Sequence, residues 1–260
     1  MAFPSLLTPI SHLFLNESDG EQIAFESDYL EARERTSHLR FANTTHYHID
    51  FDINIGLAQN QLDFLKEEVK DRESIETLTF QASRDCEKVA LVEHAYVPKS
   101  RILSIEEQVK NAKRSKKQIE DIVGTNRKIG FENNNFYATG AYSICTSLEF
   151  LTRVIQDAEY DWLFDIAHAI VTCTNQKISF DEYSTTLLKT NKCTQLHICE
   201  PDIIYSDETS AIDAHNLPSL TLTQYALDCC ERYNIKNMTV EYYKDAKILC
   251  KYLNAIRKFK

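Results

Sequence analysis

Histidines and carboxylates recur at the ends of predicted strands along this chain of 260 residues. They are His48, His94, Glu132, Asp165, His197 and Glu241, and each closes a short run typical of a buried strand. Successive members are 46, 38, 33, 32 and 44 residues apart, about the length of a strand, a helix and two loops. Because imidazole and carboxylate together suit zinc, iron or manganese, the spacing predicts a metal centre.

Two short motifs add further ligands. Asp165 is followed by His168, and Asp213 by His215 in the segment after His197. Five of the eight histidines therefore fall on the pattern. A single strand-end carboxylate usually caps a loop or a helix, so it is the joint pattern that carries the prediction.

The complete set holds nine candidate ligands, which is more than one ion accepts. It therefore predicts about two or three metal ions, with a carboxylate such as Glu132 bridging them. We expect Glu132, Asp165 and His197 to carry the chemistry, at the face of the barrel where the strand ends converge.

Short apolar runs alternate with helical patterns along the whole chain. The predicted strands are 22–27, 45–51, 89–97, 128–133, 162–166, 194–199 and 238–242, with an eighth expected within 6–15. The predicted helices are 60–71, 104–123, 145–158, 181–190, 221–233 and 244–257. This order predicts an α/β fold: one TIM-like (β/α)8 barrel domain over residues 1–260, with its metal site at the C-terminal ends of the strands. An open doubly wound sheet is the alternative, but no glycine-rich nucleotide loop supports it.

Composition and charge narrow the class of protein. Hydrophobic residues make up 43% and charged residues 26%, which excludes collagen-like and wholly disordered chains. No apolar run is long enough to span a membrane. The net charge of −10 opposes binding to a nucleic-acid backbone.

The cysteines indicate a reducing environment. There are eight of them and no C-x-x-C pair, so we interpret them as free thiols of a cytoplasmic protein. Residues 1–15 lack a basic start and a cleavage site, and we interpret them as part of the fold and not as an export signal. No cysteine is assigned to the metal centre.

At its motifs the sequence resembles the multinuclear non-haem iron-dependent oxidases, TIM-barrel enzymes that modify peptide cysteines. The resembling segments are Phe25–Tyr29 (FESDY), Leu91–His94, Gly130–Tyr137 (GFENNNFY), Leu163–Thr174 (LFDIAHAIVTCT), Gln195–Pro201 (QLHICEP), Ile212–Pro218 (IDAHNLP) and Thr239–Lys244 (TVEYYK). The resemblance implies these iron ligands: His48, His94, Glu132, Asp165, His197, Asp213, His215 and Glu241, with Glu132 bridging. Many family members have Asn where this chain has His168.

The resemblance also implies an activity. A mixed Fe(II)/Fe(III) centre would take up the thiolate of a cysteine in a precursor peptide. With O2 as co-substrate, hydrogen would be abstracted from the cysteine side chain, and oxidative rearrangement or carbon excision would follow. A small partner protein that recruits the leader part of the peptide is implied as well.

Three other functions remain open on sequence alone. Endonuclease-IV-like enzymes share the D-x-x-H and D-x-H elements and hydrolyse phosphodiesters with zinc, but the acidic charge and the missing glycine-rich loops disfavour this. A sugar isomerase or epimerase on the same barrel needs fewer ligands and leaves Asp213 with His215 unexplained. A non-catalytic barrel that acts as a scaffold would bind no metal.

Overall fold

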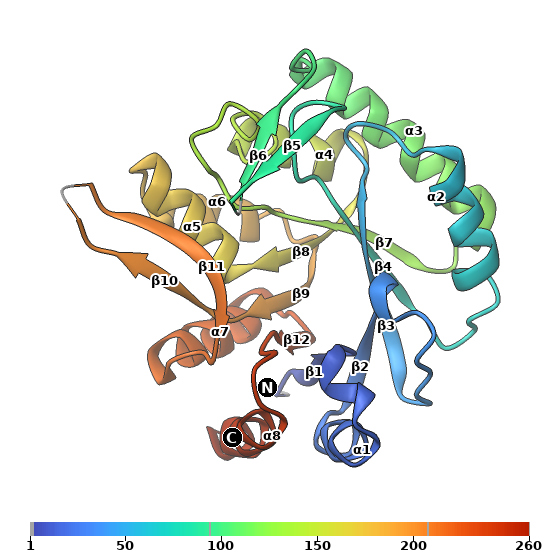
Figure 1. Cartoon of the computed structure of the whole chain (residues 1–260), viewed down its shortest axis with the longest axis vertical. Helices are drawn as coiled ribbons and strands as arrows, with labels where there is room; N and C mark the ends of the chain where they lie inside the picture. The colour runs from blue at the N-terminus through green and yellow to red at the C-terminus, as the bar shows by residue number, and fades with distance from the viewer. Residues whose placement is uncertain (1–2, 94, 207, 260) are drawn as a thin grey trace.

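The computed structural model describes residues 3–93, 95–206 and 208–259. Within these residues, eight parallel strands close into a barrel (Figure 1). They are β1 (Ser5–Pro9), β2 (Tyr29–Arg33), β3 (Thr44–Asp52), β4 (Thr77–Gln81), β7 (Lys128–Glu132), β8 (Asp161–Asp165), β9 (Cys193–Ile198) and β12 (Asn237–Val240). Each is hydrogen-bonded to the strands that precede and follow it in this order, and β12 pairs with β1. The predicted TIM-like barrel is confirmed.

Helices cover the outside of the barrel (Figure 1). They are α1 (Glu17–Glu26), α2 (Gln59–Phe64) with its π-helical continuation η3 (Leu65–Val69), α3 (Ile105–Val123), α4 (Leu148–Asp157), α5 (Ile166–Gln176), α6 (Phe180–Leu188), α7 (Leu220–Tyr233) and α8 (Ala246–Ile256). Short 3-10 turns lie at η1 (His12–Leu15), η2 (Glu34–Thr36) and η4 (Arg257–Phe259). Serine N-caps start several of the helices: Ser104, Ser147 and Ser219 each accept a hydrogen bond from the backbone N–H three residues later. Among the described residues, no helix is both long and apolar enough to cross a membrane.

Side chains along each strand alternate between the outside of the barrel, where they pack against the helices, and its interior. In β8, Trp162 and Phe164 stack on each other, and Trp162 also packs against Phe131 at a ring-centroid distance of 4.8 Å. Because successive strand residues point to opposite sides, Leu163 and Asp165 share the other, inward side. The same alternation brings polar side chains inward on neighbouring strands, so the strand ends gather them at one end of the barrel.

The prediction of a strand at 22–27 is wrong. Residues 22–26 belong to α1, and Ser27 caps the C-terminal end of that helix. The side chain of Asn16 accepts a hydrogen bond from the backbone N–H of Asp19 at 3.1 Å and caps the helix. Glu17 and Asp19 lie in the first turn, where negative charge stabilises a helix. The barrel strand of this region is β2, which begins at Tyr29.

The prediction of a barrel strand at 89–97 is also wrong. This run folds back as an antiparallel hairpin of β5 (Val89–Val92) and β6 (Ala95–Pro98) outside the barrel (Figure 1). Glu93 has a φ of 55°, a left-handed conformation that turns the chain. The barrel strand is instead β4, so Gln81 ends it. The predicted ligand His94 lies outside the described residues.

A second hairpin follows β9. It consists of β10 (Glu200–Ile204) and β11 (Ser210–Asn216), which the sequence analysis treated as a loop. Its return strand carries Asp213 and His215 and lies against α5. All eight cysteines lie in the described part of the chain and are free thiols.

Candidate metal centre

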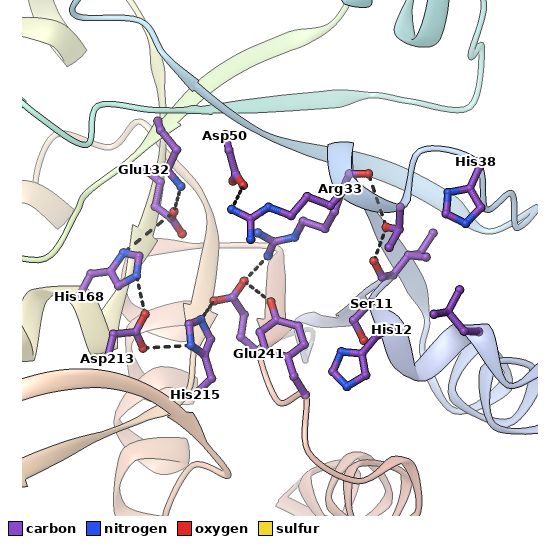
Figure 2. Close-up of a pocket in the computed structure, with 16 residues that line it drawn as sticks. Ser11, His12, Arg33, His38, Asp50, Glu132, His168, Asp213, His215 and Glu241 are labelled. Atoms are coloured by element: carbon purple, nitrogen blue, oxygen red, sulfur yellow. Dashed lines mark hydrogen bonds and ion pairs between the residues drawn. The ribbon is translucent and has the colours of Figure 1, made fainter. Parts of the chain in front are cut away.

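Eight of the nine predicted ligands converge at the C-terminal end of the barrel, and the ninth, His94, lies outside the described residues. They are His48, Glu132, Asp165, His168, His197, Asp213, His215 and Glu241, and neighbouring members lie 2.9 to 4.0 Å apart. Several of them line a cavity of about 560 Å³, and Figure 2 shows His168, Asp213, His215 and Glu241 pointing toward one another at its edge.

The first group surrounds Nδ1 of His197 and is here named the central position. Oε1 of Glu132 lies 2.9 Å from this nitrogen, Oε1 of Glu241 3.3 Å and Oδ2 of Asp165 3.9 Å. The four side chains are buried. Oε1 of Glu132, Oδ2 of Asp165 and Nδ1 of His197 have no partner with hydrogen-bond geometry among the described residues. Buried acceptors that meet in this way are satisfied by a cation, so the residues present fit a metal ion.

The second group, named the outer position, lies around Asp213. Oδ2 of Asp213 lies 3.3 Å from Nε2 of His168, and its Oδ1 lies 3.4 Å from Nδ1 of His215. Nδ1 of His168 lies 2.7 Å from the carbonyl oxygen of Asn133, which fixes the ring and leaves Nε2 facing Asp213. Oε2 of Glu241 lies 3.5 Å from Nε2 of His215. Glu241 therefore contacts one histidine of each group, His197 through Oε1 and the Nε2 side of His215 through Oε2.

His48 lies on the other side of Glu132. Its Nε2 is 3.6 Å from Oε2 of that carboxylate. The amide nitrogen of Gln81 contacts both atoms, at 2.8 Å from His48 and 2.6 Å from Glu132. Asn134 donates to Oε1 of Gln81 at 3.1 Å and so orients the amide. The neutral amide of Gln81 thus lies between His48 and Glu132, where a metal ion would otherwise bind.

Two residues of β2 complete the centre, and the sequence analysis missed both. Oε2 of Glu31 lies 2.9 Å from Nε2 of His197 and also accepts a hydrogen bond from Gln195 at 2.5 Å. This contact assigns the His197 proton to Nε2 and turns Nδ1 toward the central position. Arg33 lies 2.6 Å from Oε1 of Glu31 and also contacts Glu241. Its guanidinium supplies positive charge between these two carboxylates, so Oε1 of Glu241 is shared between Arg33 and the central position.

The electrostatics of the centre favour cations. Burial and the neighbouring carboxylates of Glu132 and Glu241 raise the pKa of Asp165 to about 7. Burial lowers the pKa of His197, but the surrounding carboxylates outweigh it and raise that pKa well above its usual value. Burial and nearby carboxylates likewise raise the pKa of the Cys199 thiol. The site thus has an excess of negative charge, which metal binding with release of protons would neutralise.

The opposite wall of the cavity comes from the N-terminal end of the chain. This wall includes Ser11, which caps the first 3-10 turn, together with His12 of that turn and His38 (Figure 2). Arg35 also lines this wall and forms an ion pair with Asp50 at 2.8 Å. The cavity therefore has a ligand-rich wall and a wall with basic and hydroxyl groups.

Residues 94–252 match the family described as RiPP precursor modification enzyme MbnB/TglH/ChrH. The match covers more than half of the chain and includes all of the central and outer positions. The chain belongs to this family. It is therefore an enzyme that modifies the precursor of a ribosomally synthesised and post-translationally modified peptide. A comparison with curated proteins gave no match.

Solved structures of sugar epimerases share the fold of this family member. The chain is similar to 3-keto-D-glucoside 4-epimerase YcjR from E. coli, with 11% identity, a TM-score of 0.61, and 98% of this chain and 99% of that chain covered. It is similar to D-allulose 3-epimerase from Methylomonas sp. in complex with D-allulose, with 12% identity, a TM-score of 0.61, and 100% and 99% covered. It is also similar to a D-tagatose 3-epimerase-like protein, with 17% identity, a TM-score of 0.59, and 98% and 99% covered. At these identities the likeness supports the barrel alone.

Proposed function

We propose that this enzyme is an iron- and O2-dependent oxidase that modifies a cysteine of its precursor peptide, by oxidative rearrangement or carbon excision. We further propose that it acts with a small partner protein that binds the leader part of the peptide. Family membership supports the peptide substrate, and the candidate ligand set supports redox chemistry.

One observation carries the proposal. The candidate ligands form a continuous network in which neighbours are 2.9 to 4.0 Å apart, from His48 through Glu132 and His197 to Asp213 and His215. Ligands of one small metal ion lie about this far apart, because each lies about 2.1 Å from the ion. A network that long exceeds the reach of one ion and supports a multinuclear centre.

The donor set supports iron. Three carboxylates and one imidazole face one another at the central position, and the outer position adds carboxylate and imidazole donors. Oxygen and nitrogen donors of this kind hold iron in both its Fe(II) and Fe(III) states. Iron bound here would supply one-electron chemistry with O2 and a Lewis acid for a cysteine thiolate. We propose ions at the central and outer positions; a third ion at His48 would be the most weakly bound, because the Gln81 amide competes there.

The residues of the chain have separate tasks in this proposal. Glu31 orients His197, and Glu241 faces both positions. The cavity of about 560 Å³ has room for a cysteine and its neighbours in a peptide. The hydroxyl of Tyr243 donates to Glu241 at 3.0 Å, which holds that carboxylate at the edge of the cavity.

The test is elemental analysis and Mössbauer spectroscopy of protein purified without oxygen. We expect about two or three irons per chain and a mixed-valence signal. Zinc in place of iron, with hydrolysis of an abasic-site DNA, would overturn the proposal in favour of a phosphodiesterase. Protein that binds no metal after reconstitution would overturn both.

Activity gives the second readout. Iron-loaded enzyme, the precursor peptide and the partner protein are incubated with O2, and the peptide is analysed by mass spectrometry. We expect a mass change on the cysteine that requires iron and O2, and no change in a peptide with Ser in place of that cysteine. Modification that proceeds equally without O2 would contradict the oxidase proposal.

A further inference from the structure

We propose that Cys199 supplies a thiolate ligand to the outer metal position, beside Asp213 and His215. The inference rests on the proposed function, because it requires that this position binds a metal ion. It changes the donor set that the sequence analysis assigned, in which no cysteine takes part.

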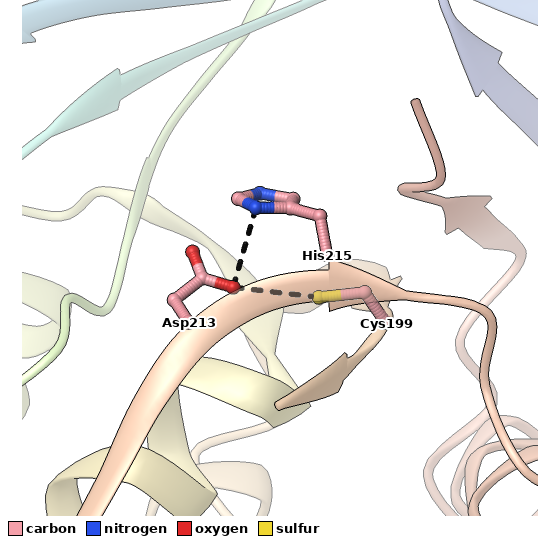
Figure 3. A group of neighbouring side chains, drawn as sticks. All are labelled: Cys199, Asp213 and His215. Atoms are coloured by element: carbon pink, nitrogen blue, oxygen red, sulfur yellow. Dashed lines mark hydrogen bonds and ion pairs between the residues drawn. The ribbon is translucent and has the colours of Figure 1, made fainter. Parts of the chain in front are cut away.

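The separations of the ligand atoms support a shared ion. Sγ of Cys199 lies 3.7 Å from Oδ1 of Asp213, and the same oxygen lies 3.4 Å from Nδ1 of His215 (Figure 3). Ligand atoms of the three residues all lie within 4.8 Å of one another. Metal–oxygen and metal–nitrogen bonds of about 2.1 Å and a metal–sulfur bond of about 2.3 Å place tetrahedral ligands about 3.4 to 3.6 Å apart. The separations of 3.7 Å and 3.4 Å are close to this range.

The place of Cys199 in the fold also distinguishes it from the other cysteines. It directly follows β9, the strand that carries His197, and it is fully buried at the ligand end of the barrel. The thiols of Cys86, Cys145 and Cys193 donate to backbone carbonyl groups, as ordinary buried cysteines do. Cys199 faces a carboxylate instead.

A buried carboxylate oxygen between the central and outer positions supports a cation beside this group as well. Oδ2 of the fully buried Asp165 has no hydrogen-bond partner among the described residues. It lies 3.9 Å from Nε2 of His168, which in turn lies 3.3 Å from Asp213. A buried carboxylate oxygen without a hydrogen bond costs free energy unless a cation satisfies it.

A thiolate would make the two metal positions chemically different. The central position has oxygen and nitrogen donors only, whereas the outer position would add a soft sulfur donor. On binding, the thiol proton is released to solvent, and the thiolate with the Asp213 carboxylate balances the charge of a divalent ion. Soft donors favour iron or zinc over magnesium or manganese at this position.

Cobalt(II) reports the sulfur ligand directly. Protein stripped with a chelator is titrated with Co(II) without oxygen, and its absorption is recorded. We expect wild-type protein to show the intense near-ultraviolet band of thiolate-to-cobalt charge transfer. Cys199→Ser should lose this band and about one bound ion. The matched control is Cys193→Ser, at the other end of the same strand, which should keep both the band and the ion count.

A second measurement needs no variant. X-ray absorption of zinc-loaded wild-type protein should show a sulfur neighbour at about 2.3 Å. Bound ions with only oxygen and nitrogen neighbours, or a charge-transfer band that persists in folded Cys199→Ser, would overturn the thiolate and leave the proposed function intact. Wild-type protein that binds no metal would overturn the proposed function and the inference with it.

Discussion

The buried carboxylates of the N-terminal half of the barrel (β1 to β4) and of the C-terminal half (β7 to β12) have different partners. In the C-terminal half, Asp165 and His197 face one another at the central position without hydrogen-bond geometry. In the N-terminal half, the guanidinium of Arg33 contacts both Glu31 and the inward-facing Glu241. The carboxylates around Asp165 therefore lack a cation, whereas Glu31 and one oxygen of Glu241 already face the guanidinium of Arg33.

The His48 region extends this comparison with a neutral group. There the amide of Gln81 donates to Oε2 of Glu132 and contacts Nε2 of His48. Ligand-type residues at a strand end are thus not enough to define a metal site. Where a neighbouring strand supplies a hydrogen-bond donor to the same ligand atoms, those atoms are already satisfied and gain less from binding a metal ion. We therefore expect tighter metal binding at the central and outer positions than at His48.

The largest effect is expected from Asp165→Asn. Oδ1 of Asp165 accepts from the backbone N–H of His168 at 2.7 Å and caps α5, and an asparagine oxygen can do the same. The substitution removes a charged ligand while retaining the cap. We expect loss of about one ion and a fall in peptide turnover of more than about 100-fold, beyond the usual effect of outer-shell changes. Metal analysis and mass spectrometry of the peptide measure both.

The matched control is Asp161→Asn, at the opposite end of β8. Asp161 lies at the N-terminal end of the strand, away from the ligands, so metal content and turnover should not change. A fully loaded Asp165→Asn enzyme would show that the C-terminal half does not depend on this carboxylate.

The sequence predicted the C-terminal half closely. The predicted strands 128–133, 162–166 and 194–199 differ from β7, β8 and β9 by one residue at most at each end. The outward side of each of these strands is apolar, and one predicted ligand lies at the C-terminal end of each strand. The end of the apolar run and the ligand therefore indicate the same strand end. The converging ligands followed from the parallel order of the strands.

The N-terminal half could not be predicted in the same way. β2 was missed because its inward residues, Glu31 and Arg33, are charged, and a charged pair in so short a run does not indicate a buried strand. Only the closed barrel brings Arg33 to Glu241, more than two hundred residues later. The identity of the residue that ends β4, Gln81, likewise depended on recognising that the run 89–97 forms a hairpin.

The next effect is expected from Glu31→Gln. Oε2 of Glu31 accepts from Gln195 and contacts His197, and Oε1 forms an ion pair with Arg33, whereas an amide is neutral and has one oxygen to share among these groups. His197 would lose its fixed orientation. We expect binding at the central position to weaken by about 10- to 100-fold, measured by calorimetric titration of metal-free protein with Zn(II).

Glu34→Gln is the control for that variant. Glu34 belongs to the same segment and accepts from the backbone N–H of Asp50 at 3.2 Å, away from His197. Its substitution should leave the affinity unchanged. If both variants bound Zn(II) equally weakly, the loss of affinity would come from a general disturbance of the fold and not from the contact between Glu31 and His197.

A smaller gain is expected from Gln81→His. The new imidazole would lie beside His48 and Glu132 and replace a hydrogen-bond donor by a metal ligand. We expect the protein to take up about one additional ion at saturating metal, measured by equilibrium dialysis and elemental analysis. Gln81→Leu, which removes the amide without adding a ligand, should not gain it. An unchanged count in Gln81→His would show that the amide is not what limits binding there.

The smallest effect is expected from His48→Ala, and it tests the comparison most directly. If the Gln81 amide keeps Oε2 of Glu132 satisfied, loss of the His48 imidazole should leave the central and outer ions in place, with less than about a threefold change in affinity. His46→Ala is the control, because His46 is a buried histidine two residues earlier on β3. Circular dichroism verifies that both variants are folded. Loss of about one ion in His48→Ala alone would make His48 a ligand, as the sequence resemblance implies, and Glu132 a carboxylate that joins two ions. A metal ion would then bind at His48 after displacing the Gln81 amide. The two halves of the barrel would both bind metal and would differ only in affinity.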